Sequence, residues 1–375
     1  MKKICFVLTA EFAVKAFLLG HLRALSKYYD VTVIVNTNNP SFLAEQGINA
    51  KVVPLAIARD ISLIADVSCL LQLVKLFYQQ SFSAVHSITP KAGILAMMAA
   101  YIVRVPLRVH TFTGQVWVTK GGFKRLLLKM FDRLIAFLAT NIIVDSYSQR
   151  QFLLEEGVIT KAKSVVFGSG SVSGVDLSRF KYSAQVRLEV RNRLNINADA
   201  IVFLFLGRLN LDKGVLDLAN AFSKLPTGSA CLLFVGPDEQ NMQIKIESIL
   251  ANNASNVRFV GYTNVPENYM SAVDVLFLPS YREGFGSVVI EAAAVGIPTV
   301  ASRIYGVCDA VVDGETGLLH EPHAVNEIED CMKDMMSNRA LRLKLGKQAQ
   351  TRAVKDFDSQ LITQAWVNFY HENVQ

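Results

Sequence analysis

Residues 275–295 read VLFLPSYREGFGSVVIEAAAV and contain the patterns of a strand, a loop and a helix, in that order. The apolar run at 275–279 is typical of a buried strand, and the run at 291–295 is helical. Between them, Gly284 and Gly286 let backbone N–H groups come close to a ligand at the start of a helix. A strand that leads directly into a helix is the unit from which parallel sheets are built, so this stretch predicts an α/β fold.

The same alternation of apolar strands and helices recurs along the rest of the chain. In the first half we expect strands at residues 4–8, 31–35, 51–54, 84–87, 107–111 and 141–145, with helices near 15–28, 61–79, 91–103, 121–139 and 146–157. In the second half we expect strands at residues 201–206, 231–235, 257–260, 275–279, 299–302 and 317–320, followed by helices at 327–336, 340–354 and 359–370. A glycine- and serine-rich connection at 165–180 separates the halves. The pattern therefore predicts two doubly wound domains, residues 1–180 and 181–356.

The composition is that of a folded protein without a membrane-spanning segment. Of the 375 residues, 51% are hydrophobic and 19% are charged, which excludes the charge-rich composition of disordered chains. The longest uninterrupted apolar run, residues 92–103, has 12 residues, whereas a helix needs roughly 20 to cross a bilayer. The N-terminus lacks the long apolar stretch and cleavage site of a signal peptide, so we expect the protein to remain in the cytoplasm.

The two halves of the chain carry net charges of opposite sign. Residues 1–180 hold 20 Lys and Arg against 10 Asp and Glu, whereas residues 181–375 hold 18 against 22. A basic half suits nucleic acid, anionic lipid or a phosphorylated substrate, and charge alone does not choose among them. The segment at 120–131 mixes cations with leucines, and its helical part suits either packing on the first sheet or peripheral contact with an anionic inner membrane. Membrane contact is therefore one hypothesis for this half.

Two carboxylates accompany the loop that follows the strand at 275–279. Glu283 stands in the loop, and Glu291 falls about one turn into the helix. Carboxylates so placed accept hydrogen bonds from vicinal hydroxyl groups, which suits a sugar ligand. The alternative is a glycine-containing turn with one solvated glutamate and one first-turn glutamate that the helix dipole favours.

A second loop, residues 207–214, reads GRLNLDKG and follows the strand at 201–206. Arg208 can bind phosphate through two parallel hydrogen bonds, and Lys213 supplies a compact charge, so the pair suits a diphosphate. Taken alone, the same residues also fit an ordinary basic surface loop. Because ligands of doubly wound sheets bind at the carboxyl ends of the strands, we expect both loops to border a ligand cleft between the two domains.

Five segments together give the chain its resemblance to a known family. They are residues 110–114 (HTFTG), 168–177 (GSGSVSGVDL), 207–214 (GRLNLDKG), 283–291 (EGFGSVVIE) and 313–318 (DGETGL). In these segments the chain resembles retaining glycosyltransferases of family 4, similar to bacterial enzymes of capsule, O-antigen and lipid-linked glycan assembly. The resemblance implies the GT-B fold, in which two Rossmann-like domains border an active site in the cleft between them. It also implies that the helix at about 357–375 packs back on the N-terminal domain.

The resemblance implies a role for each matching residue. Arg208 and Lys213 would hold the donor diphosphate and neutralise the charge that develops on the leaving group. Glu283 would bind hydroxyls of the transferred sugar, and Glu291 would accept hydrogen bonds from the ribose. His110 would lie next to the sugar, near the anomeric carbon. The implied catalytic set is His110, Arg208, Lys213 and Glu283, and the implied donor-binding set is Gly207, Arg208, Lys213, Glu283, Gly284, Phe285, Gly286, Ser287 and Glu291.

The implied reaction moves a hexose or N-acetylhexosamine from a nucleoside-diphosphate donor, a UDP-sugar, to a lipid-linked glycan with retention of configuration. Residues 1–180 would bind the acceptor and residues 181–356 the nucleotide-sugar, and no nucleic acid would take part. Two alternatives remain open: a nucleotide-sugar epimerase of similar fold, and a two-domain sugar-binding protein without catalytic activity.

Two residue pairs with the chemistry of metal ligands are interpreted otherwise. Asp356 and Asp358 resemble the acid pair that binds Mn²⁺ in a different glycosyltransferase fold, but here we expect them to head the last helix as caps. His320 and His323 are separated by a proline, which breaks the helix that would align two imidazoles. We therefore expect neither a metal nor another cofactor, since the nucleotide-sugar is a substrate.

Overall fold

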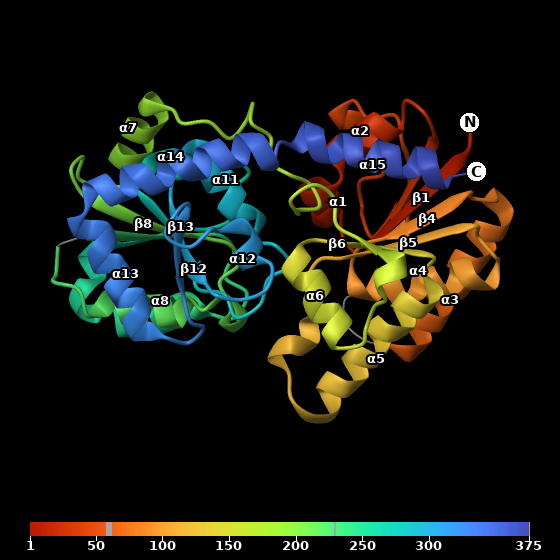
Figure 1. The fold of residues 1–375 in the computed structure, drawn as a ribbon, viewed down its shortest axis with the longest axis horizontal. Helices are drawn as coiled ribbons and strands as arrows, with labels where there is room; N and C mark the ends of the chain where they lie inside the picture. Colours follow the sequence, from red (N-terminus) through yellow and green to blue (C-terminus); the bar gives the residue numbers. More distant parts are fainter. Residues whose placement is uncertain (58–61, 229, 375) are drawn as a thin grey trace. The chain divides into compact units, whose positions relative to one another are not determined.

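The computed structural model describes residues 1–57, 62–228 and 230–374 (Figure 1). Its contacts divide the chain into two compact units. Unit 1 comprises Met1–Gly174 and Ser359–Gln375, and unit 2 comprises Val175–Asp358. Each unit is built around one parallel sheet with helices on both faces, so the predicted fold class is confirmed. The first residue of the helix expected at 61–79 lies outside the described residues.

The sheet of unit 1 has seven parallel strands in the order β3-β2-β1-β4-β5-β6-β7. The strands are β1 (Lys3–Leu8), β2 (Asp30–Val35), β3 (Lys51–Pro54), β4 (Ala84–Ser87), β5 (Leu107–Phe112), β6 (Asn141–Val144) and β7 (Ser164–Val165). The helices are α1 (Glu11–Phe17), α2 (Leu19–Leu25), α3 (Leu63–Gln80), α4 (Pro90–Ile102), α5 (Gly122–Leu138), α6 (Tyr147–Glu155) and α15 (Ser359–Asn373), and short 3-10 turns lie at η1 (Ala44–Gln46), η2 (Val116–Thr119) and η3 (Lys161–Lys163).

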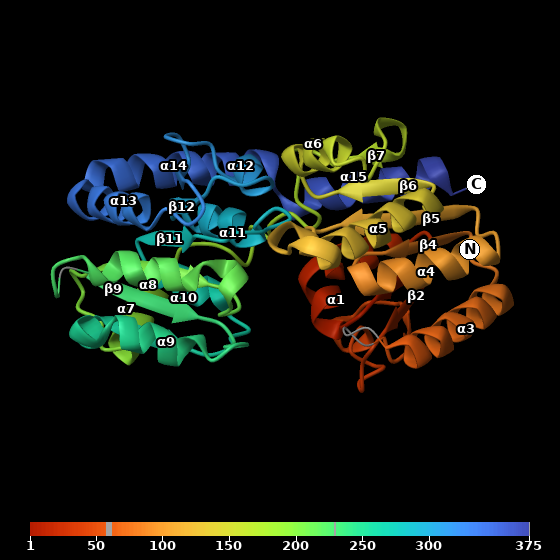
Figure 2. The same ribbon diagram turned by 90° about the horizontal axis from the view of Figure 1, so that it is seen from below.

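Strand β1 shows why both faces of this sheet are covered. Successive side chains of a strand point to opposite faces. Ile4 and Phe6 pack into a core with α2 and α15, whereas Cys5 and Val7 pack into a second core with α3, α4 and α5. Figure 2 shows α3, α4 and α5 side by side on their face of the sheet. A strand that is apolar on both sides therefore requires helices on both sides.

The sheet of unit 2 has six parallel strands in the order β10-β9-β8-β11-β12-β13. The strands are β8 (Ile201–Leu206), β9 (Ala230–Val235), β10 (Val257–Val260), β11 (Val275–Leu278), β12 (Thr299–Ser302) and β13 (Gly317–His320). The helices are α7 (Ala184–Arg193), α8 (Val215–Ser223), α9 (Met242–Ile249), α10 (Pro266–Ala272), α11 (Ser287–Val295), α12 (Val307–Ala310), α13 (Val325–Ser337) and α14 (Arg339–Asp356), with 3-10 turns η4 (Leu211–Lys213) and η5 (Ala251–Asn256). Strand order reverses between β8 and β11, and ligands of such sheets bind at that point.

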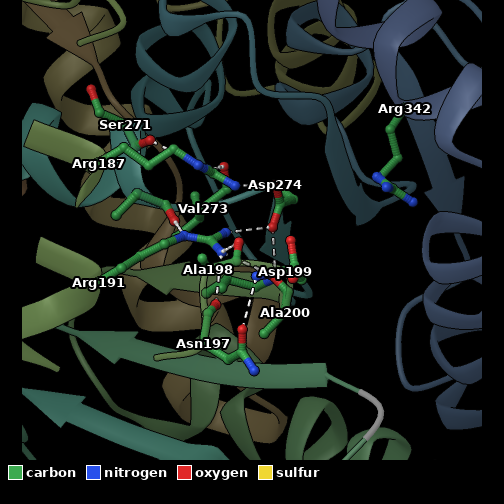
Figure 3. A network of polar contacts seen from close by, with 12 residues as sticks. Arg187, Arg191, Asn197, Ala198, Asp199, Ala200, Ser271, Val273, Asp274 and Arg342 are labelled. Carbon is green, nitrogen blue, oxygen red and sulfur yellow. Dashed lines mark hydrogen bonds and ion pairs between the residues drawn. The ribbon is translucent and has the colours of Figure 1, made fainter. Parts of the chain in front are cut away.

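A buried arginine network fixes the amino-terminal ends of β8 and β11 (Figure 3). Arg191 is 2% exposed, and its guanidinium donates to the backbone carbonyl of Ala272 at 2.8 Å and to the Asp274 carboxylate at 2.9 Å. The same carboxylate accepts from Arg187 and from the backbone N–H of Val202, each at 2.8 Å. Because this network lies at the edge of the sheet opposite the carboxyl ends, its role is structural.

Three local expectations were wrong. The helix expected at 15–28 is two short helices, α1 and α2, with a break at Leu18, and α2 packs against α15. Strand β7, only two residues long, was not expected, and it pairs with β6. Of the aspartate pair, Asp358 directly precedes α15 as expected, whereas Asp356 is the last residue of α14 and pairs with Arg352 at 3.6 Å.

Across residues 1–57, 62–228 and 230–374, no helix combines the length and apolar character that crossing a membrane requires.

Candidate active site

Two loops of unit 2 lie at the carboxyl ends of adjacent strands. The first, residues 207–214, follows β8, and the second, residues 279–286, follows β11. Strands β8 and β11 pair directly, with Val275 opposite Phe203. The loops therefore begin next to each other at the point where strand order reverses. This agrees with the expectation that both loops lie at the carboxyl ends of the strands.

The two loops are held against each other by close backbone contacts. Gly214 has a φ of +65°, and a Cβ added there would lie 2.0 Å from the carbonyl oxygen of Pro279. The backbone N–H of Tyr281 donates to the carbonyl of Asp212 at 2.8 Å. The Asp212 carboxylate also pairs with Arg282 at 3.0 Å. Any residue larger than glycine at position 214 would push the loops apart, so their spacing is built into the fold.

Lys213 and Glu283 form an ion pair that joins the two loops. The Lys213 ammonium lies 2.5 Å from Oε1 of Glu283, and both side chains are mostly buried. The same carboxylate oxygen accepts from the hydroxyl of Ser280 at 2.8 Å. The pair places a cation and a hydrogen-bond acceptor side by side, an arrangement that suits a ligand with an anionic group next to hydroxyl groups.

Arg208 is held by a carboxylate that the sequence reasoning missed. Its Nη1 lies 3.1 Å from both oxygens of Glu239, and the Asn210 amide donates to the same carboxylate at 3.0 Å. The Arg208 side chain remains 43% exposed, so a ligand can reach it. Glu239 follows β9, and the rule that ligand-binding loops follow the carboxyl ends of strands could have identified its loop.

In the loop between Glu283 and α11, the groups that remain for a ligand are backbone groups rather than side chains. The Phe285 ring is buried against Phe357, with ring centroids 5.3 Å apart, so the side chain belongs to the core. Gly284 is buried, and Gly286 adopts the left-handed conformation just before α11. Ser287 is the first residue of that helix.

Gly207 contributes to the packing of the loops, and its backbone N–H is already used in a hydrogen bond. Its backbone N–H donates to the carbonyl of Val235 at 2.9 Å. A Cβ added at Gly236 would lie 1.9 Å from the carbonyl oxygen of Gly207. The loop after β8 is therefore locked to the loop after β9.

Glu291 lies on α11 as a partly buried carboxyl. No residue in the described ranges donates a hydrogen bond to its carboxylate. Burial raises the pKa of Glu291 to about 7, the positive charge of Arg179 opposes that rise, and the negative charge of Glu267 adds to it. Arg179 itself pairs with Glu267 at 2.9 Å. Among the described residues, the Glu291 carboxylate is therefore an acceptor without a protein donor.

His110 lies in unit 1, on β5, and its ring is buried. Its Nδ1 lies 2.8 Å from the hydroxyl oxygen of Ser87, and its ring meets Phe112 edge to face. A Cβ added at Gly93 would lie 2.6 Å from the imidazole, so a glycine makes room for the ring. Burial lowers the pKa of His110 to about 3, and the imidazole is therefore neutral at physiological pH.

The structure thus brings the loops carrying Arg208, Lys213 and Glu283 together in unit 2 and places His110 in the other unit. Within the described residues, no group of three or more His, Cys, Asp or Glu side chains is arranged to hold a metal ion. The chemistry available in unit 2 is that of cations beside hydrogen-bond acceptors.

Comparison with known proteins identifies the family. The family described as "Glycosyl transferase 4-like domain" matches residues 18–170, and "Glycosyl transferases group 1" matches residues 186–352. The capsular polysaccharide biosynthesis glycosyltransferase CapM of Staphylococcus aureus is 30% identical over 325 residues, which cover 86% of this chain and 84% of CapM. The UDP-Gal:alpha-D-GlcNAc-diphosphoundecaprenol alpha-1,3-galactosyltransferase of Escherichia coli is 25% identical over 340 residues, which cover 89% and 86%.

Solved structures share the fold. HepE from Anabaena, solved in complex with UDP-glucose, superimposes with a TM-score of 0.83 at 19% identity, covering 99% of this chain and 100% of that chain. Both halves of the chain therefore match glycosyltransferases in sequence, and the whole chain matches one in fold. The chain belongs to glycosyltransferase family 4, has the GT-B fold, and is related to enzymes that build capsules and lipid-linked glycans.

Proposed function

We propose that the chain transfers a sugar from a UDP-sugar to a lipid-linked glycan, with retention of configuration, during assembly of a bacterial surface polysaccharide. The observation that carries the proposal is the Lys213–Glu283 pair, which sets a cation beside an acceptor at the switch point of unit 2. The names of the relatives support the substrates: the Escherichia coli enzyme uses UDP-Gal and a diphosphoundecaprenol acceptor, and HepE was solved with UDP-glucose.

In this proposal the donor diphosphate binds to Arg208 and Lys213. Each cation is paired with a carboxylate in the structure, Arg208 with Glu239 and Lys213 with Glu283. A diphosphate carries more negative charge than either carboxylate and accepts hydrogen bonds from both cations at once. These two cations would also stabilise the charge that develops on the departing diphosphate, which is usually the largest single contribution to such catalysis.

The two glutamates then bind the hydroxyl groups of the donor. When the diphosphate takes Lys213, the Glu283 carboxylate becomes available to hydroxyls of the transferred sugar. Glu291 accepts from the ribose, and the backbone from Gly284 to Ser287 lies beside the ligand. Unit 2 is thus the nucleotide-sugar domain in this proposal, and the N-terminal domain binds the acceptor.

The proposed chemistry needs no covalent intermediate on the enzyme. The acceptor hydroxyl attacks the anomeric carbon from the side of the leaving group, and a donor phosphate oxygen takes its proton. His110 serves next to the sugar as a neutral hydrogen-bonding group, because burial keeps it uncharged. The diphosphate is neutralised by Arg208 and Lys213, and we propose no metal for that role.

A transfer assay tests the proposal. The full chain is incubated with labelled UDP-glucose, UDP-galactose and their N-acetylamino counterparts, together with an undecaprenyl-diphosphate sugar. We expect label from one donor in the lipid phase, with the anomeric configuration of the donor retained in the product by NMR. Conversion of one UDP-sugar into another without transfer would instead identify an epimerase.

The pKa of Glu291 makes donor binding depend on pH. The ionised carboxylate accepts from ribose hydroxyls better than the neutral acid does, and burial raises this pKa to about 7. Affinity for the UDP-sugar should therefore rise about tenfold between about pH 6 and about pH 8, as the carboxyl loses its proton. Isothermal titration calorimetry with the UDP-sugar measures this affinity across the pH range. UDP itself is not used as the ligand, because its terminal phosphate also titrates in this range.

The control for this prediction is Glu291→Gln, which cannot ionise. Its affinity should be weaker than that of the wild type at high pH and independent of pH. A wild-type affinity that is flat or falls as the pH rises would contradict the role given to Glu291.

A further inference from the structure

The side chain of Arg208 is held at only one of its three guanidinium nitrogens. Its Nη1 lies 3.1 Å from each carboxylate oxygen of Glu239. A guanidinium has five N–H donors, and donors on two neighbouring nitrogens bind a phosphate as a fork. In the described part of the chain, neither Nε nor Nη2 has an acceptor within hydrogen-bonding distance. Glu239 therefore holds Arg208 and still leaves one edge of the guanidinium available to a ligand.

The Glu239 carboxylate is in turn fixed by the loop that carries Arg208. The Asn210 amide donates to Oε2 of Glu239 at 3.0 Å, and Asn210 is 7% exposed. The backbone N–H of Glu239 donates to the carbonyl of the buried residue Leu209 at 3.2 Å. The carboxylate thus has two contacts of its own with residues 209–210, besides its contact with the guanidinium.

The chain on either side of Glu239 is anchored as well. The Asp238 carboxylate accepts from the backbone N–H of Met242, the first residue of α9, at 2.8 Å. The side-chain oxygen of Gln240 accepts from the backbone N–H of Leu211 at 3.0 Å. One neighbour of Glu239 is therefore tied to α9 and the other to the loop after β8, which gives the carboxylate a fixed place beside Arg208.

The ion pair itself contributes little to the stability of unit 2. The side chains of Arg208 and Glu239 are 43% and 34% exposed, and ion pairs that solvent reaches in this way add little to the free energy of unfolding. What the pair does is restrict the guanidinium. A long side chain loses rotamer freedom when it binds a ligand, and a side chain that is ordered beforehand avoids most of that loss.

We infer that Glu239 is a positioning residue of the proposed transferase: it holds Arg208 through Nη1, so that Nε and Nη2 meet the departing diphosphate as a fork. Donors that are aligned in advance stabilise a developing charge without the cost of rearranging during the reaction. This role rests on the proposed function in one respect, since it assigns Arg208 to the donor diphosphate.

The expected effect of Glu239 is on the rate of transfer rather than on the binding of UDP. Without its carboxylate, Arg208 must be ordered by the ligand, which weakens binding. The same loss removes a negative charge that repels the diphosphate, which strengthens binding. These two effects oppose each other in the complex with UDP. In the transition state the direct hydrogen bonds from Arg208 gain importance, whereas solvent screens the more distant and partly exposed carboxylate.

Kinetics of the full chain with a saturating lipid-linked acceptor test this role. Glu239→Gln keeps the shape of the side chain and removes the charge that holds Nη1. We expect kcat for transfer to fall roughly tenfold, because a catalytic donor is misplaced rather than removed. The dissociation constant for UDP, measured by titration calorimetry, should change by less than about threefold, because ordering and repulsion oppose each other. A residue that served only the stability of the fold would not produce this separation.

A double-mutant cycle shows whether Glu239 acts through Arg208. The rate of Arg208→Ala, followed with radiolabelled donor because turnover is slow, is compared with the rate of Arg208→Ala/Glu239→Gln. We expect the second substitution to change this rate by less than about twofold, since the guanidinium that Glu239 positions is already absent. A loss of about tenfold in both backgrounds would make the effect of Glu239 independent of Arg208 and overturn the inference.

A measurement that needs no turnover follows the Arg208 side chain itself. In protein that contains isotope-labelled arginine, the Nε–H signal of Arg208 is assigned by its absence from Arg208→Ala. The order parameter of this bond should be high in the wild type, as for a rigid backbone, and should fall in Glu239→Gln. A wild type that transfers no sugar would defeat the proposed function alone. A low order parameter in the wild type, or an equal one in Glu239→Gln, would overturn the positioning role.

The matched control is Glu247→Gln on α9, the same substitution at an exposed carboxylate that accepts from the Gln243 amide at 2.8 Å. It should keep the wild-type kcat, the wild-type affinity for UDP and the wild-type order parameter of Arg208. UDP binding that is about tenfold tighter in Glu239→Gln, with kcat unchanged, would show that Glu239 competes with the diphosphate for Arg208 and would overturn the inference.

Discussion

Replacing Lys213 by Ala should lower kcat/KM for sugar transfer by roughly a hundred- to a thousandfold, the cost of removing one preorganised charge from a developing oxyanion. The ammonium lies 2.5 Å from Glu283 and links the two loops that border the proposed donor site. Its loss removes one of two proposed diphosphate contacts. It also leaves the mostly buried Glu283 carboxylate without its partner, so the sugar pocket changes as well. Initial rates with a saturating lipid-linked acceptor measure the effect.

A matched control separates catalysis from general damage. Lys224 lies at the far end of α8 from the two loops, and its ammonium is 3.3 Å from the carboxylate of Glu329. Lys224→Ala should therefore leave the rate of transfer within about twofold of the wild-type rate. Glu283→Gln keeps the shape of the side chain while removing its charge, and it should also lose most activity. Wild-type turnover in Lys213→Ala and Glu283→Gln, with unchanged thermal stability, would show that these loops are not the donor site.

Replacing Arg191 by Ala should destabilise unit 2 by about 3 to 5 kcal/mol, the usual cost of removing one partner from a buried ion pair. The guanidinium satisfies the carbonyls of Ala198, Ala200 and Ala272 and pairs with the Asp274 carboxylate (Figure 3). Without it, buried carbonyls lose their donors. Urea unfolding, monitored by far-UV circular dichroism of the backbone, gives the change in the free energy of unfolding.

Arg193 on the same helix provides the comparison. Its side chain is exposed and donates to the Tyr269 hydroxyl at 3.1 Å, so Arg193→Ala should cost about 1 kcal/mol or less. If Arg191→Ala yields no folded protein, Arg191→Lys, which keeps the charge but loses most of the hydrogen bonds, should fold with an intermediate loss. An unfolding midpoint for either Arg191 variant equal to that of the wild type would contradict the structural role given to the network.

The strands were the most predictable part of the fold. The expected bounds at 51–54, 84–87, 201–206, 257–260 and 299–302 match those of the structure. Strands of a parallel sheet are buried on both faces and so appear as unbroken apolar runs between polar turns, a pattern that depends little on the rest of the molecule. The parallel arrangement then followed from the helices between successive strands.

Features that depend on tertiary contacts were not predictable in the same way. The break at Leu18 falls inside an apolar helical pattern, and α2 is positioned by packing against α15, more than 330 positions later in the sequence. The two residues of β7 carry no pattern of their own and become a strand only by pairing with β6. Local sequence does not contain this information.

The candidate site was predictable to the level of its loops and not of its ion pairs. Glycines and charges after β8 and β11 identified the loops that carry Arg208, Lys213 and Glu283, because the carboxyl ends of adjacent strands meet at one edge. The partnership of Arg208 with Glu239 needs the register of a third strand, β9, which the sequence does not provide. The neutrality of His110 likewise depends on how deeply its strand is buried.

Thermal unfolding with and without UDP tests the central claim most directly, because it asks whether unit 2 binds a nucleoside diphosphate before any acceptor is known. At a UDP concentration of about 100 times the dissociation constant, bound ligand stabilises the folded state by roughly 2.7 kcal/mol. We expect the wild type to unfold at a higher temperature with UDP, and Arg208→Ala and Lys213→Ala to lose most of that shift. No shift with UDP, or a shift with free sugar and none with any nucleotide, would contradict the account and favour a sugar-binding protein.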